Sequence, residues 1–257
     1  MQNSEVVPQP LEKEFERTHD LVMGFIQWLY FCMADTARDN EFTNNHLLSF
    51  LNQDILETLM GVLVLVKEGI HAPVIRESRY LLEVSIKLTY IQQSEYRMPI
   101  EGKLKEFENT IKSPSISPMK KISLSLLKPD ISEEFLIEVG RLYGESSNFV
   151  HLTPHSIEYR RARIGDERLL GYESEEDLIQ LNNFLQRIYA ASIVFLSHAV
   201  PQYVVGDWHV DSSGGLKKWY YLKSKYIAQI DSSLDYKHER QHILERLVAE
   251  RISNVAF

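Results

Sequence analysis

Residues 74–91 read VIRESRYLLEVSIKLTYI, and the spacing of their apolar side chains decides the fold class. At 100° per residue these side chains form two opposite arcs of a helical wheel. One arc holds Ile75, Leu82, Ile86 and Tyr90, and the other holds Leu81, Val84, Leu88 and Ile91. A helix that is apolar on two sides lies inside a bundle. We therefore predict a central helix over residues 73–93, surrounded by other helices.

Helical spacing also dominates the rest of the chain. Apolar residues recur every three or four positions in six further stretches, residues 11–38, 44–68, 132–151, 175–205, 216–230 and 236–253. We predict an all-α protein with a single bundle of about seven helices. Residues 1–206 would form the bundle, and residues 207–257 would pack on it as a C-terminal helical extension.

One segment departs from this spacing. Residues 157–172 read IEYRRARIGDERLLGY, with Gly165 and Asp166 in the middle and partial alternation of apolar and polar residues on both sides. This pattern predicts either a small β-hairpin or an irregular loop.

The composition is that of a globular protein, with 44% hydrophobic and 25% charged residues in a chain of 257. The net charge of −8 excludes a general nucleic-acid binder, so a phosphate site would need a local basic patch. The single cysteine, Cys32, fits a reducing environment. The longest apolar run, residues 59–66, is shorter than the roughly 18 residues of a membrane span. We expect a cytoplasmic protein without a signal peptide or a membrane segment.

A zinc-protease signature, H-E-x-x-H, occurs at His238-Glu239-Arg240-Gln241-His242. In such enzymes two histidines one helical turn apart hold the metal, and the glutamate polarises the attacking water. The charged neighbours, and the lack of a third ligand on another element, favour a solvated surface helix. We therefore predict no bound metal and no cofactor, and keep a zinc metalloprotease as a third alternative.

Arg79 lies in the middle of the first apolar arc, and Glu83 lies at its edge one turn later. A buried charge is strongly unfavourable unless it is paired, so Arg79 needs a partner, and Glu83 is an obvious candidate. The pair is either an internal ion pair that fixes helix packing, or an anion site in which Arg79 binds a phosphate and Glu83 orients it.

Tyr143, Ser147 and His151 follow one another at four-residue steps along the edge of an apolar helix face. Gly140 and Gly144 flank this line, and a glycine inside a helix costs about 1 kcal/mol. The two glycines therefore predict a close approach, either by a neighbouring helix or by a ligand that the three polar side chains line. His151 stands at the expected end of the helix, where the helix dipole favours a titrating histidine.

The densest basic patch of the chain follows this helix, and it consists of His155, Arg160, Arg161, Arg163 and Arg168. Histidine beside arginine suits a site for RNA or phosphate, in which histidine acts as general acid or base. The alternative is a solvated loop in which the arginines pair with nearby acidic residues.

Two patterns together, R-x-x-x-E on one helix and Y-x-x-x-S-x-x-x-H on a later one, resemble a group of uncharacterised bacterial helical proteins. The matching residues are Arg79, Glu83, Tyr143, Ser147 and His151, in roughly the middle third of the chain. More distantly, SSNFVH at residues 146–151 is similar to the HEPN superfamily. These are helical bundles common in prokaryotic toxin and antiviral systems, and many of them are metal-independent, dimeric ribonucleases.

The HEPN resemblance implies an active site of arginine, a polar residue and histidine on one helix. Asn148 and His151 match it, but Glu145 and Ser146 stand where the arginine is expected. The arginine would then come from Arg79, from residues 160–168 or from a second subunit.

We therefore expect a stress or antiviral-defence protein that binds RNA or a nucleotide phosphate, possessing ribonuclease activity if it is an enzyme. His151 would be the general acid or base, Asn148 and Ser147 polar supports, and Arg79 an anion anchor. The alternative is a non-catalytic helical module that binds an operon-encoded partner or forms a homodimer. The two hypotheses differ in whether Arg79 and His151 converge on a solvent-reachable cleft.

Overall fold

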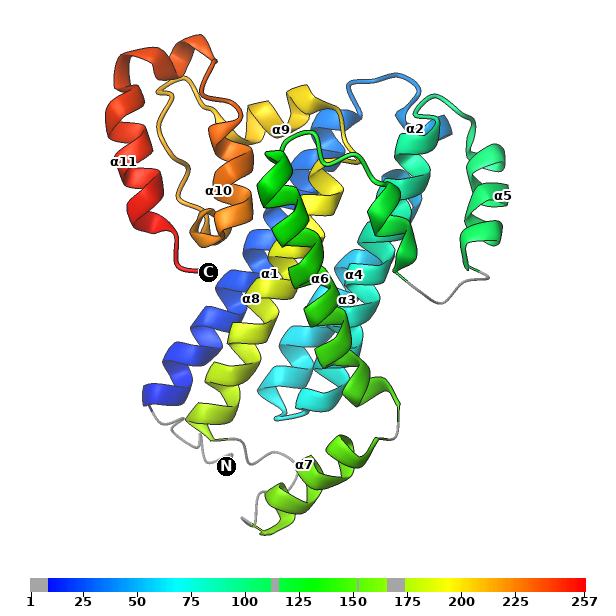
Figure 1. Cartoon of the computed structure of the whole chain (residues 1–257), viewed down its shortest axis with the longest axis vertical. Coiled ribbons are helices and arrows are strands. Elements are labelled where there is room, and N and C mark those ends of the chain that lie inside the picture. Colours follow the sequence, from blue (N-terminus) through cyan, green and yellow to red (C-terminus); the bar gives the residue numbers. More distant parts are fainter. Residues whose placement is uncertain (1–8, 112–115, 152, 166–173) are drawn as a thin grey trace, which may run out of the picture.

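The computed structural model describes residues 9–111, 116–151, 153–165 and 174–257. Within these residues the chain is all-helical and contains no strand (Figure 1). The α-helices are α1 (Gln9–Thr36), α2 (Phe42–Asn45), α3 (Leu48–Lys67), α4 (His71–Ser94), α5 (Ile100–Ile111), α6 (Pro129–Val150), α7 (Pro154–Gly165), α8 (Glu175–Ser197), α9 (Gln202–His209), α10 (Lys225–Ser232) and α11 (Leu244–Asn254). The all-α prediction is confirmed, whereas about seven helices is too low a count for the eleven in the described residues.

The long helices α1, α3, α4, α6 and α8 form the body of the bundle (Figure 1). α4 packs against α3, α6 and α8, and α8 packs against α1 as well. Both apolar arcs of α4 are buried, as Leu82 on one side and Leu81 on the other have no exposed surface. The central position that the two arcs predict for this helix is therefore confirmed.

The positions where helices end explain part of the difference between the about seven helices predicted and the eleven in the described residues. The stretch 175–205 forms two helices, because Pro201 has no N–H to continue the hydrogen-bond ladder and its ring clashes with the preceding turn. α8 ends at Ser197, and α9 begins after Pro201. At its other end α8 starts with a capping box, in which Ser174 and Asp177 bond each other's backbone N–H.

The C-terminal part packs on the bundle at one end (Figure 1). The predicted helix over residues 216–230 is shorter than expected, because only α10, Lys225–Ser232, is α-helical there. The segment before it is tied to α1 by two side chains: Trp219 Nε1 donates to the Gly24 carbonyl at 2.9 Å, and Tyr221 Oη donates to the Leu21 carbonyl at 2.6 Å.

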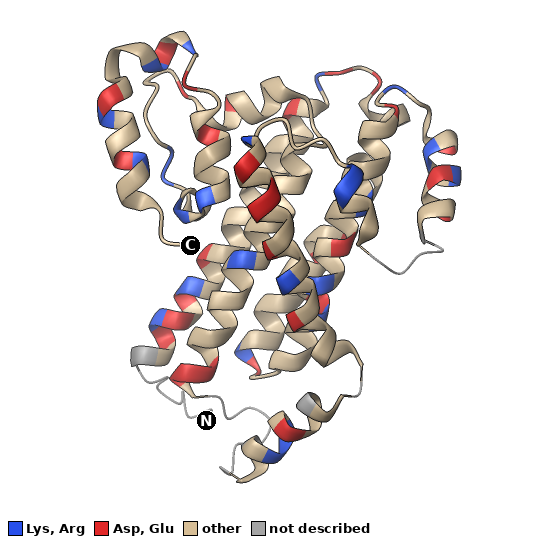
Figure 2. Cartoon of the chain, viewed as in Figure 1, with Lys and Arg blue, Asp and Glu red and all other residues tan. Residues whose placement is uncertain are grey.

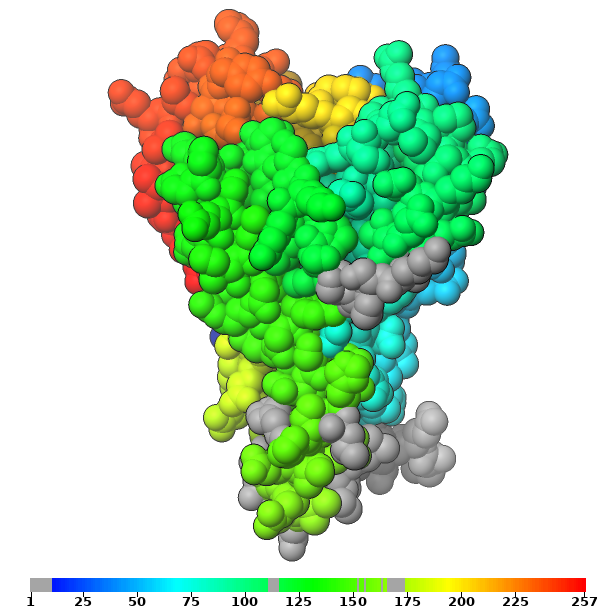
Figure 3. All heavy atoms as spheres, turned by 45° about the vertical axis from the view of Figure 1, so that its right-hand side comes forward, coloured from blue at the N-terminus to red at the C-terminus, as the bar shows by residue number. Residues whose placement is uncertain are grey.

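The segment predicted as either a hairpin or an irregular loop contains a helix instead. α7 covers residues 154–165, so both alternatives are wrong there, and residues 166–173 lie outside the described part. The Thr153 hydroxyl accepts from the Ser156 N–H at 3.1 Å, and the Ser156 hydroxyl accepts from the Thr153 N–H at 3.1 Å. This reciprocal cap starts a helix that alternation of side chains alone does not reveal. Figure 3 shows α7 at the far end of the body from the C-terminal helices.

One helix of the described residues, α3, is long and apolar enough to cross a membrane by length and composition. A mostly buried core helix of a soluble protein can pass the same test, but only 22% of the most apolar 18-residue stretch of α3 is buried, so the finding is weak evidence in either direction. Asp54 and Glu57 lie on its exposed side, where a charge would be unfavourable in lipid. That the protein lacks a membrane segment and is cytoplasmic stays a prediction.

Charges are interspersed along the helices. Figure 2 shows Lys and Arg alternating with Asp and Glu along α1, α5 and α11. Because both signs are mixed along these helices and the net charge is −8, a binding site for an anion has to be built locally.

Candidate functional site

The two sequence patterns meet where α4 packs against α6. Arg79 Nε donates to Glu83 Oε1 at 3.0 Å, which is the partner expected one turn along α4. Its Nη1 donates to the Ser147 hydroxyl at 2.8 Å, and its Nη2 donates to the Tyr143 hydroxyl at 2.7 Å. Arg79, Glu83, Tyr143 and Ser147 therefore form one cluster, which we call the arginine clamp.

The arginine clamp holds its guanidinium group on three sides and on one face. Each of the three nitrogens donates one hydrogen bond, and the group also stacks over the Tyr143 ring at 4.1 Å from the ring centroid. A phosphate is normally bound through two adjacent N–H groups on one free edge of arginine. Here every edge already includes a nitrogen bound to a protein oxygen.

Burial and charge stabilise the clamp. Only 10% of the Arg79 side chain and 22% of the Glu83 side chain are exposed. Lys87 Nζ lies 3.7 Å from the second Glu83 oxygen, so this carboxylate has two cationic neighbours. Burial, and then the charge of Glu83, raise the pKa of Tyr143 above its ordinary value, so the phenol is a neutral hydrogen-bonding group at physiological pH.

His151 is not part of the arginine clamp. It is the residue after the last turn of α6, its side chain is exposed, and its N–H donates to the Ser147 carbonyl at 3.3 Å. We find no hydrogen bond to its ring among the described residues. The structure therefore joins four of the five pattern residues and leaves the expected general acid or base in solvent.

The two glycines of α6 do not have the close neighbour that the sequence predicts. A Cβ atom added to Gly140 or to Gly144 would meet nothing within 4 Å among the described residues. No other helix of the described residues lies against them, so the prediction of a close neighbouring helix is wrong there, and the alternative of a ligand stays a prediction. Both glycines stand on an exposed face.

The basic patch is carried by α7. Arg160 and Arg161 are exposed on this helix, while the side chains of His155 and Arg163 are outside the described part, as is the whole of Arg168. The rings of Phe149 on α6 and Tyr159 on α7 lie edge to face, with their centroids 5.6 Å apart. This contact fixes the side of α7 that faces the bundle.

Asn148 faces a separate cavity of about 370 Å³ where α4, α6, α7 and α8 meet. Its lining combines aromatic, acidic and polar side chains, and includes His71, Glu145, Phe149, Tyr159, Asp177 and Phe184. Neither Arg79 nor His151 belongs to this lining. The three residues expected to act together at one catalytic centre, Asn148, His151 and Arg79, are thus found in three different surroundings.

The H-E-x-x-H segment is a 3-10 helix rather than an α-helix. With three residues per turn, positions i and i+4 point about 120° apart, whereas an α-helix brings them to one face. Arg240, one of the three residues between the histidines, is fully buried, which corrects the expectation of a wholly solvated helix. Among the described residues no group of three or more His, Cys, Asp or Glu is arranged to hold a metal ion.

Arg240 belongs to a buried ionic cluster that sequence reasoning missed. Its Nη2 donates to Asp231 Oδ1 at 2.6 Å, and Arg251 Nε donates to Asp231 Oδ2 at 2.8 Å. Burial alone would raise the pKa of Asp231. Hydrogen bonds and charge from His209 and Arg240 nevertheless hold this pKa well below its usual range. The sequence gives little sign of this cluster, because Arg240 and Arg251 stand among polar residues at the spacing of ordinary surface charges.

Comparison of this chain with protein-family models, with curated proteins and with solved structures finds no match. The resemblance to HEPN proteins and to the R-x-x-x-E and Y-x-x-x-S-x-x-x-H family stays a prediction. The function therefore has to be argued from the geometry of the arginine clamp, the glycine face of α6 and the cavities.

Proposed function

We propose that this chain is a non-catalytic helical interaction module, which docks a helix of another protein chain on an exposed face of α6. The observation that carries the proposal is the engagement of Arg79. Its three nitrogens bind Glu83, Tyr143 and Ser147, so the arginine acts as a tie between α4 and α6. A catalytic arginine would need a free edge directed at the substrate.

The docking face consists of Ile137, Gly140 and Gly144, which fall within about 60° of one another on the helical wheel. Ile137 is 60% exposed, and both glycines face open space. Two glycines in a helix interior cost about 1 kcal/mol each, and packing among the described residues does not require them. Small residues spaced four apart allow the backbone of a second helix to approach closely. Docking of such a helix would explain why glycine stands at both positions.

The proposal is tested by placing a photo-cross-linking amino acid at Ile137 in the native cells. A matched probe at Ile252 on α11, which is 71% exposed, reports random encounters. We expect one defined adduct from position 137 and none from position 252. Sedimentation velocity of the purified chain distinguishes a second copy from a different protein.

Substitutions of Gly140 separate docking from folding. Gly140→Leu fills the open face and should abolish the adduct, whereas Gly140→Ala should keep it, because alanine still allows close approach. Both variants should unfold at or above the wild-type temperature, since a Cβ added at Gly140 meets nothing within 4 Å in the part of the chain that the structure describes. An adduct that survives Gly140→Leu, or no adduct from position 137, contradicts the docking face.

A second candidate function, binding of a nucleotide or single-stranded RNA, is favoured by the cavity beside Asn148. Phe149, Tyr159 and Phe184 offer aromatic surfaces for a base, and Asn148 offers an amide for its edge. The exposed Arg160 and Arg161 on α7 are available for phosphates.

Fluorescence anisotropy with a labelled oligonucleotide tests this candidate. Tyr159→Ala should weaken binding, while Tyr236→Ala, at a tyrosine that is 68% exposed elsewhere, should not. Equal affinity of both variants and the wild type would remove the cavity as the site.

A further inference from the structure

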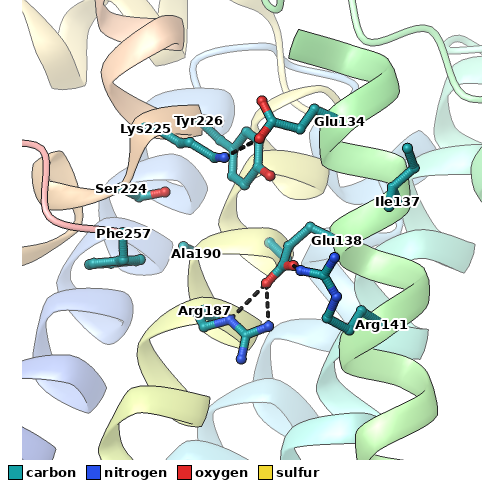
Figure 4. Close-up of a pocket in the computed structure, with 11 residues that line it drawn as sticks. Glu134, Ile137, Glu138, Arg141, Arg187, Ala190, Ser224, Lys225, Tyr226 and Phe257 are labelled. Atoms are coloured by element: carbon teal, nitrogen blue, oxygen red, sulfur yellow. Dashed lines mark hydrogen bonds and ion pairs between the residues drawn. The ribbon is translucent and has the colours of Figure 1, made fainter.

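A cavity of about 360 Å³ lies between α6, α8 and the start of α10, on the side of the bundle that carries the C-terminal segment (Figure 4). Its walls have an apolar part and a charged part. The apolar part comes from Ile137, Ala190, Ala191 and Phe257, and the charged part from Glu134, Glu138, Arg141, Arg187 and Lys225. The arginine clamp contributes no residue to this lining.

Ser224 is the feature of this cavity that points to a ligand. It is the N-cap of α10, it is fully buried, and its hydroxyl has no hydrogen-bond partner among the described residues. An N-cap serine normally accepts from the second or third amide of its helix, but here it makes no such bond. In Figure 4 its hydroxyl points from the start of α10 into the space between the helices.

Two of the first amides of α10 also have no acceptor among the described residues. The Lys225 N–H donates to the backbone oxygen of Phe257, the last residue of the sequence, at 2.7 Å, and the Ala228 N–H begins the helical ladder on the Ser224 carbonyl at 2.8 Å. For the N–H groups of Tyr226 and Ile227 we find no acceptor among the described residues. A hydroxyl donor and two free amides at a helix N-terminus are suited to an anion.

The charged side chains limit how much negative charge the cavity accepts. Arg187 Nε donates to Glu138 Oε1 at 2.7 Å, and Lys225 Nζ pairs with Glu134. These pairs are already balanced, so no free cluster of cations is left for a dianion such as phosphate. A single negative charge held by neutral donors fits better, and the apolar walls provide room for a hydrocarbon body.

From this arrangement we infer that the cavity binds a small amphipathic carboxylate. The carboxylate accepts hydrogen bonds from the Ser224 hydroxyl and from the first free amides of α10. The hydrocarbon body lies against Ile137, Ala190 and Phe257. The inference goes beyond the proposed function and needs no protein partner, although Ile137 belongs both to this cavity and to the docking face.

Isothermal titration calorimetry of the full chain tests the inference with octanoate as the probe. Octan-1-ol has the same chain without the charge, and acetate has the charge without the chain. We expect octanoate to bind at least tenfold more tightly than either, because only octanoate uses both parts of the cavity. Equal affinity for octan-1-ol and octanoate, or no binding of octanoate up to millimolar concentration, would overturn the inference.

Ser224→Ala is the decisive variant. Because the Ser224 hydroxyl has no partner in the fold, the variant should keep the wild-type unfolding temperature, while octanoate binds about tenfold more weakly. Ser233→Ala, at the other end of α10, serves as the matched control and should bind like the wild type. Ala190→Leu, which fills the apolar part, should weaken octanoate and octan-1-ol alike. Unchanged octanoate affinity in Ser224→Ala would place the ligand elsewhere.

Discussion

Replacing Arg79 by methionine tests the role of the arginine clamp in the fold. Methionine replaces the aliphatic part of the arginine side chain but removes the guanidinium group, its charge and all three hydrogen bonds. Removing one partner of a fully buried ion pair typically destabilises a protein by about 3–5 kcal/mol. The Glu83 side chain is 22% exposed and keeps Lys87 at 3.7 Å, so the lower end of this range applies.

We therefore expect Arg79→Met to lower the free energy of unfolding by about 3 kcal/mol. In a chain of this length that corresponds to a fall in Tm of roughly 6–10 °C. The assay is urea unfolding followed by circular dichroism, with Arg141→Ala as control. Arg141 pairs with Glu138, but 61% of its side chain is exposed, so the control should change stability by about 0.5 kcal/mol or less.

A double-mutant cycle tests whether Ser147 on α6 is a partner of Arg79 on α4. Ser147→Ala should cost about 1 kcal/mol in the wild type, through the lost bond to Arg79. In the Arg79→Met background the same change should cost much less, because that bond is already absent. Wild-type stability of Arg79→Met, or an equal cost of Ser147→Ala in both backgrounds, would refute the clamp.

Three further predictions concern other parts of the molecule. Gly140→Ala and Gly144→Ala should each raise the free energy of unfolding by about 0.5–1 kcal/mol, measured in urea, because both glycines face open space inside a helix. His46 and His198 each accept a backbone N–H, and burial lowers the pKa of each to about 4. Their contribution to stability is complete above the unfolded pKa near 6.5 and is lost as the pH falls toward 4. Urea titrations at pH 7.5 and pH 5 should therefore differ by about 2 kcal/mol per histidine, and His198→Gln should remove its share. Asp231→Asn should destabilise the fold by about 3 kcal/mol or more, seen as a lower Tm, because it leaves buried arginines without their counter-charge.

The central helix and its ion pair follow from local spacing. The two apolar arcs of residues 74–91 place α4 inside the bundle, and Arg79 within one arc requires a partner that Glu83 supplies at i+4. Both inferences need only the geometry of one helix. The bonds from Arg79 to Tyr143 and Ser147 span more than sixty residues, and helical spacing carries no information on which faces of two helices meet.

Other features depend on contacts that one segment does not contain. Arg240 reads as a solvated residue, but it is buried because Asp231, nine residues earlier, lies in the C-terminal core. Gly140 suggests a close neighbour, and the described part of the chain provides none. The hairpin or irregular loop expected from residue 157 is a helix that begins at Pro154, since the cap at Thr153 outweighs a weak alternation of side chains.

Incubation of the purified chain with total cellular RNA in EDTA, beside the His151→Ala variant, tests the non-catalytic role most directly. We predict that neither protein cleaves RNA, because Arg79 is held in the clamp and His151 stands apart from it. Cleavage by the wild type that the variant loses would contradict the proposal and establish a metal-independent ribonuclease that uses His151.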